Sequence, residues 1–305
     1  MRAEWAPRFA CPDCGAALDD DRDRVRRTCA YCARDYELRD GLWRFLTAPR
    51  AARLEPFVRQ YREVRSRDGH RQSRPAEHYR TLPSVPRKDP QASEWLIRRE
   101  TFHHLLQRVL ASSVQPMHVL DVGAGTGWLS HRLASLGQRV VAVDALDDEA
   151  DGLGALRHYE VPFVAVQADF DALPFVPKQF DLVVFNGSLH YAPDAAATLA
   201  RARRMLTHGG ALVVMDSPMF RRDRDGAAML EDKYNRFRHD LAVSSVVQPG
   251  VGYLTYARLG AIARSLDLQP QFVPTRGPLP WRLRRHLARV RLRRAPAAFG
   301  LWMAR

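Results

Sequence analysis

The sequence predicts an α/β fold built on a doubly wound, mostly parallel sheet. From Gln91 onward, short apolar stretches of strand length alternate with segments that carry apolar residues at helical spacing. One such stretch, ending at Val122, runs through three closely spaced glycines into a helical pattern, as at the nucleotide-binding edge of such sheets. Hydrophobic residues make up 46% of the chain, which is enough for a sizeable core. No run of eighteen apolar residues occurs, so we expect no transmembrane segment.

The chain divides by composition into three parts. Residues 1–46 form a small cysteine-bearing module, residues 47–90 an Arg/Pro-rich linker or cap, and residues 91–305 the α/β domain. Six prolines interrupt the linker, so we expect one helix near 54–64 followed by irregular structure.

The elements of the α/β domain follow from apolar periodicity and from glycines and prolines at element ends. Residues 217–254, irregular or helical, should lie over the carboxyl edge of the sheet. Helices are expected at 92–111, 128–136, 148–157, 193–206 and 255–266. Strands are expected at 117–122, 139–144, 163–167, 181–186 and 211–216, with closing strands at 271–273 and 299–304.

The glycine-rich turn is the strongest sign of a ligand site. Gly123, Gly125 and Gly127 follow a buried strand and precede a helix, so the backbone can bend sharply and approach a ligand closely. The spacing G-x-G-x-G differs from the G-x-G-x-x-G of dinucleotide sites. Asp121, two residues before the first glycine, would repel a pyrophosphate but would attract the ammonium group of a bound amino acid.

Two more acidic positions follow the next strands. Asp144 ends the second strand, 21 residues after Gly123, where a carboxylate can accept both hydroxyls of a ribose. Asp169 follows the third strand and could accept the amino group of an adenine, with Phe170 packed on the ring. Together these groups match an adenosine joined to an amino acid.

With these motifs in this order, the sequence resembles the class I S-adenosylmethionine-dependent methyltransferases (the methyltransferase type 11-like group). The blocks 180–186 and 206–212 also match the family motifs. The resemblance implies a Rossmann-like, seven-stranded sheet of order 3-2-1-4-5-7-6 with strand 7 antiparallel. It also implies a set of residues that bind S-adenosyl-L-methionine. These are Asp121, Gly123, Ala124, Gly125, Gly127, Asp144, Ala145, Asp169, Phe170 and Asn186.

The candidate catalytic residue is His190. It follows the fourth strand, where ligands of open α/β sheets bind, and could act as the base of an O- or N-methylation. Capping or packing before the helix at Pro193 is an equally good interpretation. The block 186–191 lacks the Asn/Asp-Pro-Pro-aromatic pattern of the adenine- and amide-methylating members, which disfavours a DNA amine as substrate.

The four cysteines form two C-x-x-C knuckles. Cys11, Cys14, Cys29 and Cys32 have the spacing of a structural Zn²⁺ site, for which iron is the main alternative. Four thiolates leave no open position, so the metal should be structural. The module resembles small zinc ribbons that activate or are fused to methyltransferases, and also the ribbon of a ribosomal-RNA guanine methyltransferase. Its side-chain charges balance, which gives it little reason to bind phosphates.

The net charge of +13 is concentrated outside the centre of the α/β domain. Residues 268–305 carry nine arginines and no acidic residue. Within this basic tail, Leu283, Leu287 and Val290 have helical spacing. The tail could bind RNA, make peripheral contact with an anionic membrane, or be a solvated surface.

We therefore expect a methyltransferase acting on a small-molecule or lipid-like acceptor. The alternatives are an rRNA or tRNA base methyltransferase and a catalytically inactive, cofactor-binding partner subunit. The first ten residues lack an apolar signal segment, so a cytoplasmic location is expected.

Overall fold

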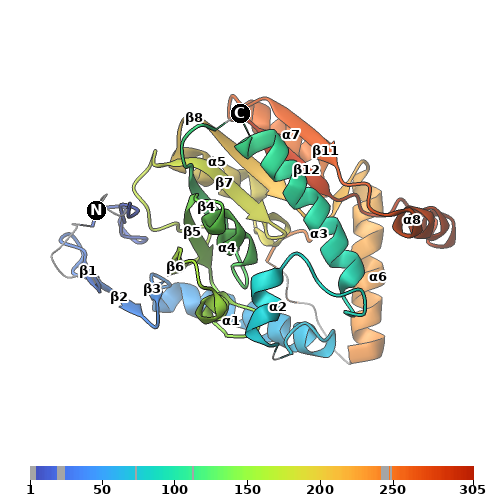
Figure 1. Ribbon diagram of the computed structural model, residues 1–305, viewed down its shortest axis with the longest axis horizontal. Helices are drawn as coiled ribbons and strands as arrows, with labels where there is room; N and C mark the ends of the chain where they lie inside the picture. The colour runs from blue at the N-terminus through green and yellow to red at the C-terminus, as the bar shows by residue number, and fades with distance from the viewer. Residues whose placement is uncertain (1–4, 19–24, 73, 112, 242–246, 248) are drawn as a thin grey trace.

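A computed structural model describes residues 5–18, 25–72, 74–111, 113–241, 247 and 249–305. A single ten-stranded sheet runs through the molecule, and helices cover both of its faces (Figure 1). Its strand order is β1-β2-β3-β6-β5-β4-β7-β8-β12-β11. A separate parallel pair is formed by β9 (Met219–Phe220) and β10 (Leu254–Thr255).

The seven strands of the α/β domain have the predicted order. Numbered along the domain, β6-β5-β4-β7-β8-β12-β11 reads 3-2-1-4-5-7-6, and β12 is antiparallel to both of its neighbours. The central strands are buried on both faces, as expected for a parallel sheet rich in valine and leucine. The seven strands of the domain are β4 (His118–Val122), β5 (Arg139–Asp144), β6 (Val164–Gln167), β7 (Phe180–Asn186), β8 (Leu206–Met215), β11 (Pro270–Pro274) and β12 (Gly300–Ala304), of which β11 is a partly exposed edge strand.

Three further strands come from the cysteine-bearing module. They are β1 (Arg26–Thr28), β2 (Asp35–Arg39) and β3 (Leu42–Arg44), and β3 pairs in parallel with β6. The rings of Phe9 and Phe45 lie 4.8 Å apart, and Phe9 also stacks on Phe175 of the α/β domain. The module therefore shares both the sheet and a core cluster with the domain that follows it.

Helices on the two faces bury different sets of side chains. Helices α3 (Ala92–Leu105) and α4 (Trp128–Ser135) pack on one face, and α5 (Ala195–Met205) and α7 (Tyr256–Ser265) on the other. The remaining helices are α1 (Ala48–Arg67), α2 (Ala76–Thr81), α6 (Asp223–Leu241) and α8 (Leu279–Arg291). Short turns of other helical type are η1 (Leu106–Leu110), η2 (Leu153–His158) and η3 (Leu189–Tyr191).

Two segments differ from the sequence-based expectation. The helix expected at 148–157 is only the 3₁₀ turn η2, because Gly152 is extended and packs directly against the backbone of Leu146 and Asp148. The linker, expected to be irregular after its one helix, contains the second helix α2. The segment 217–254, expected to be irregular or helical, contains the long helix α6. Within the described part of the chain, no helix is both long enough and apolar enough to span a bilayer.

Candidate functional site

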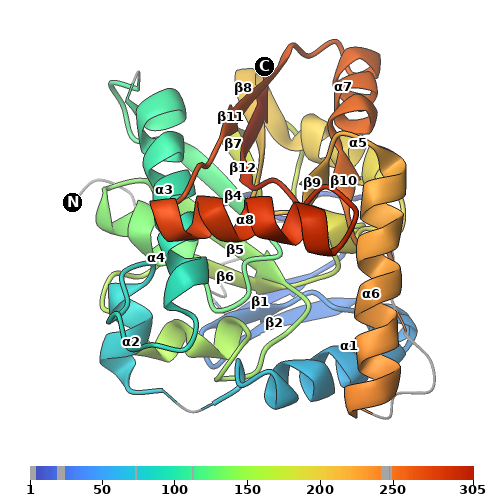
Figure 2. The same cartoon turned by 90° about the vertical axis from the view of Figure 1, so that its right-hand side faces the viewer.

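A cavity of about 700 Å³ lies at the carboxyl ends of the central parallel strands. Its floor comes from the loops after β4, β5, β6, β7 and β8, and its roof from α1 and from residues 70–98. Figure 2 shows α1 and α2 along this edge of the sheet. The Arg/Pro-rich segment thus forms a cap over the strand ends.

The glycine-rich turn forms one wall of the cavity. Gly123 (φ 74°) and Gly125 (φ 55°) are in the left-handed region, which favours glycine. A Cβ on Gly123 would lie 2.3 Å from Cβ of Ser188, so a side chain there would displace the neighbouring loop. The amide of Gly125 donates to Oδ2 of Asp144 over 2.7 Å, which joins the turn to the end of β5.

Asp144 lines the cavity and is half-buried. Burial raises its pKa to about 6, although hydrogen bonds from the amides of Leu146 and Gly125 oppose this shift. Each carboxylate oxygen accepts one backbone amide and keeps a free lone-pair direction. The residue can therefore still accept hydroxyl groups of a ligand.

Asp121 and Gly127 do not line the cavity; they lie one layer beneath it. Asp121 is fully buried, accepts a hydrogen bond of 2.8 Å from Oγ of Ser130, and leaves Oδ1 without a partner among the described residues. Burial raises its pKa to about 7. Gly127 turns toward Phe163, whose ring would lie 2.8 Å from an added Cβ. The other predicted cofactor residues, and His190, do line the cavity.

The cap contacts the third acidic position directly. Oδ2 of Asp169 is 2.5 Å from Nη2 of Arg53 and 3.2 Å from Nη1 of Arg50, both on α1. Its Oδ1 accepts the amide of Asp171. An adenine amino group at Asp169 would therefore share this carboxylate with the arginines of the cap, an arrangement that the sequence motif did not indicate.

Three aromatic side chains cluster in the wall of the cavity. Phe57 and Tyr61 of α1 meet Tyr191 of η3, with ring centroids 5.6–5.9 Å apart. The glycine-rich turn and Asp144 lie along the ends of β4 and β5, whereas His190 follows β7. This aromatic cluster gives the cavity an apolar wall suited to organic ligands.

His190 has a neutral ring near neutral pH. Its Nδ1 is 3.3 Å from Oγ of Ser217, and its ring lies against Tyr191. Burial, together with the positive charge of Lys233, lowers its pKa to about 3. A ring with this pKa can accept a hydrogen bond but is a weak base.

Asp216 is a candidate residue that the sequence motifs did not indicate. It follows β8 with a φ of 54°, lines the cavity, and has two buried carboxylate oxygens without hydrogen-bond partners among the described residues. Burial raises its pKa to about 6, although the positive charge of Arg98 and the nearby hydroxyl of Thr101 oppose this shift. An unpaired buried carboxyl beside a cavity indicates a polar group on a ligand.

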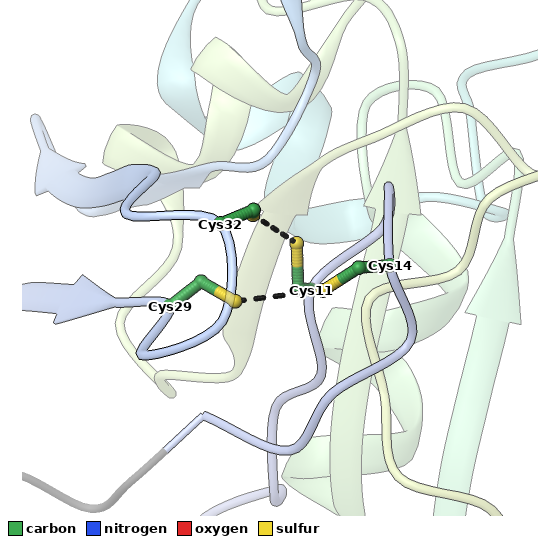
Figure 3. Close-up of side chains that lie close together, drawn as sticks. All are labelled: Cys11, Cys14, Cys29 and Cys32. Atoms are coloured by element: carbon green, nitrogen blue, oxygen red, sulfur yellow. Dashed lines mark hydrogen bonds between the residues drawn. The ribbon is translucent and has the colours of Figure 1, made fainter.

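The four cysteines come together as the spacing predicts (Figure 3). Their sulfur atoms all lie within 4.8 Å of one another, with 3.6 Å between Cys11 and Cys32 and 3.5 Å between Cys14 and Cys29. A tetrahedral zinc with Zn–S bonds of about 2.3 Å requires sulfur–sulfur distances of about 3.8 Å, so the geometry fits the metal. Tyr36 places its hydroxyl 3.1 Å from Sγ of Cys11.

Comparison with known proteins identifies the centre of this fold. Residues 120–214 match the family model "Methyltransferase domain". Malonyl-[acyl-carrier protein] O-methyltransferase of Hahella chejuensis is 36% identical over 101 residues, which are 32% of this chain and 36% of that protein. The enzyme of that name from Chlorobium luteolum is 34% identical over 104 residues, 33% of this chain and 40% of that protein. The chain thus spans about two fifths of the length of these relatives.

A solved structure shows the same fold over more of the chain. Magnesium protoporphyrin IX methyltransferase of Synechocystis PCC 6803, with bound SAH, superposes with a TM-score of 0.51 at 16% identity. The match covers 82% of this chain and 98% of that one. Together, the family match, the strand order and the cavity show that the α/β domain is a class I S-adenosylmethionine-dependent methyltransferase domain.

Proposed function

We propose that the whole chain is a methyltransferase that uses S-adenosylmethionine to methylate a small-molecule or lipid-like acceptor inside the capped cavity. The observation that carries the proposal is the continuity of this cavity, which reaches from Gly123 and Asp144 to His190 and Asp216. Its volume, about 700 Å³, falls within the range of about 300–1,000 Å³ typical of small-ligand pockets. The names of the curated relatives support a carboxylate or similar oxygen as acceptor, because they describe O-methyltransferases.

The residues present fit the cofactor in three places. Asp144 can accept the ribose hydroxyls, and the left-handed Gly123 leaves the space that a Cβ would fill. Asp169 and Phe170 lie where an adenine would be held, beside the arginines of α1. When bound, the sulfonium group supplies an electrophilic methyl group. We infer that zinc is the metal of the cysteine cluster and that its role is structural.

The protein's part in the reaction is positioning. An acceptor in the far half of the cavity would lie between the aromatic cluster and the ends of β7 and β8, with Asp216 or His190 to orient a hydroxyl, amine or carboxyl group. Asp216 is the stronger base of the two, because its pKa is about 6 whereas that of His190 is about 3.

The test combines cofactor binding with a search for the acceptor. Calorimetry with S-adenosylhomocysteine should show tight binding that Asp144→Ala and Asp169→Ala both weaken about tenfold or more. Asp181→Ala is the matched control, because Asp181 lies outside the cavity lining and its carboxylate accepts hydrogen bonds from the amide of His118 and the hydroxyl of Thr207. Transfer of labelled methyl groups into cell extract, fractionated as small metabolites, lipids and RNA, then identifies the acceptor class. Labelling of RNA alone would support the base-methyltransferase alternative, and cofactor binding without any labelling the inactive-subunit alternative.

A further inference from the structure

Exposed apolar side chains concentrate on α8. Among the described residues, twelve large hydrophobic side chains are exposed, and five of them belong to α8 or to the residue that caps its C-terminus. Four of these five form one row. The row has the spacing i, i+4, i+8, i+11, so its members share one face of the helix. They are Leu279, Leu283, Leu287 and Val290, which are 63%, 55%, 71% and 80% exposed. Figure 2 shows α8 on the surface of the molecule, lying across its near face.

Arginines flank this apolar row on both sides. At 100° per residue, Arg282 and Arg289 lie along one side of the row and Arg291 along the other. All three side chains are exposed. A helix with an apolar centre and cationic flanks matches those that lie in the plane of a membrane interface, where long side chains reach the head groups.

The structure adds a second cationic surface that the sequence does not show. Beside α8 lies a groove of about 1580 Å³, lined by residues from the start of α6, from the end of β11 and from α8. Its lining contains nine arginines and one acidic residue, Asp225. Among the side chains described, only Arg294 of the nine forms an ion pair, with Asp232 at 2.8 Å. The arginines are Arg221, Arg222, Arg224, Arg276, Arg282, Arg285, Arg289, Arg293 and Arg294.

Such a cluster of like charges is unfavourable unless anions neutralise it. RNA would satisfy the arginines, but it offers nothing to the aliphatic row of α8, since RNA-binding surfaces use aromatic rings against the bases. An anionic bilayer satisfies both features, because lipid phosphates can meet the guanidinium groups while leucine and valine side chains enter the acyl region.

We propose that α8 and the adjoining arginine groove dock the protein on an anionic lipid membrane. The helix lies parallel to the surface, with Leu279, Leu283, Leu287 and Val290 inserted below the head groups. Attachment of this kind is reversible and weakens with salt, since part of it is electrostatic. It is independent of the methyl-transfer proposal, because none of these side chains lines the cofactor cavity.

Vesicle co-sedimentation with the full-length protein tests the proposal. We expect the protein to bind vesicles of phosphatidylcholine containing one third phosphatidylglycerol and to stay in solution with phosphatidylcholine alone. The double variant Leu283→Gln/Leu287→Gln keeps the charge and should lower the partition coefficient about tenfold. Val114→Gln, at a 94% exposed valine outside α8, is the control and should bind as wild type does.

A second variant separates charge from insertion. Arg282→Gln/Arg289→Gln should weaken binding to anionic vesicles and reduce its salt dependence. All four substituted side chains on α8 are exposed, so equal melting temperatures will show that the fold is intact. The proposal fails if the wild-type protein does not bind anionic vesicles, or if the double leucine variant binds them as the wild type does. Salt-sensitive binding of an RNA hairpin without vesicle binding would also overturn it, in favour of a nucleic-acid surface.

Discussion

Arg65 of the cap and Asp151 of the α/β domain form a two-point ion pair, with Nε to Oδ2 at 2.7 Å and Nη2 to Oδ1 at 2.6 Å. The two side chains are 24% and 7% exposed, so solvent screens the pair only weakly. Because Arg65 lies in the last turn of α1, the pair joins the cap to the loop that follows β5. Together with the contacts of Arg50 and Arg53 to Asp169, it holds the roof over the cavity.

Removing the guanidinium should therefore loosen the cap. We expect Arg65→Gln to lower the free energy of unfolding by about 2–3 kcal/mol, since it leaves the Asp151 carboxylate buried without its partner. Urea denaturation provides the measurement. Arg59→Gln removes an exposed pair with Glu55 on the same helix and should change stability by less than about 0.5 kcal/mol. Equal losses in the two variants would contradict this role for Arg65.

The turn at Gly123 offers a prediction with a built-in control. Gly123→Ala combines a left-handed φ with a Cβ only 2.3 Å from Ser188, so we expect a loss of about 3 kcal/mol or more. Gly137 has a similar φ of 80°, but no atom lies within 4 Å of a Cβ added there. Gly137→Ala should therefore lower the free energy of unfolding by only about 1 kcal/mol. Thermal melts measure both. Similar losses of stability in the two variants would mean that the loop at Ser188 moves aside at little energetic cost.

The metal prediction concerns both identity and location. Elemental analysis should find one zinc per chain, and Cys29→Ser should release it, because three thiolates and a hydroxyl bind zinc far less tightly. Tyr31→Phe alters an exposed side chain between two ligands and should retain the metal. Since β3 continues the main sheet, metal loss should also lower the melting temperature of the whole protein. Iron with the absorption of a ferric tetrathiolate would instead support the alternative metal.

Much of the fold follows from the sequence because its strands are simple. The valine-rich runs around Leu120 and Val141 are buried on both faces, so composition alone locates them. The pairing of β3 with β6 was not predictable, because a three-residue strand carries no periodic signal. The order of the seven strands came from the family resemblance rather than from any local pattern.

The site was predictable only where backbone geometry depends on residue type. Glycines at 123 and 125 mark the turn, and Asp144 follows at a characteristic distance. Asp216 has no such marker, because its importance comes from burial without a partner, which only the packed structure shows. The arginines that contact Asp169 belong to a segment whose position over the sheet depends on tertiary contacts.

Cofactor affinity should depend on pH through Asp144. In the free protein, burial raises its pKa to about 6, so the group is neutral below that pH and charged above it. Ribose hydroxyls donate to the carboxylate, so a bound ligand lowers the pKa and affinity rises as pH increases through about 6. Calorimetry with S-adenosylhomocysteine at several pH values between about 5 and 8 should show this slope of affinity against pH. Asp144→Asn should flatten it, and an unchanged slope would assign the effect to Asp121.

The roles of Asp216 and His190 can be separated by the pH dependence of methyl transfer, once an acceptor is known. A base with a pKa of about 6 must be deprotonated to act. If Asp216 is that base, kcat/KM should fall as pH decreases below about 6, which gives the pH profile an acid limb. His190, with its pKa lowered to about 3, stays neutral throughout this range and produces no such limb. Asp216→Asn should therefore abolish the limb and most of the activity while leaving S-adenosylhomocysteine binding intact. His190→Gln should keep the limb and lose less activity. If the limb instead survives in Asp216→Asn and disappears in His190→Gln, the histidine is the base, and the pKa inferred from its burial does not apply to the occupied site.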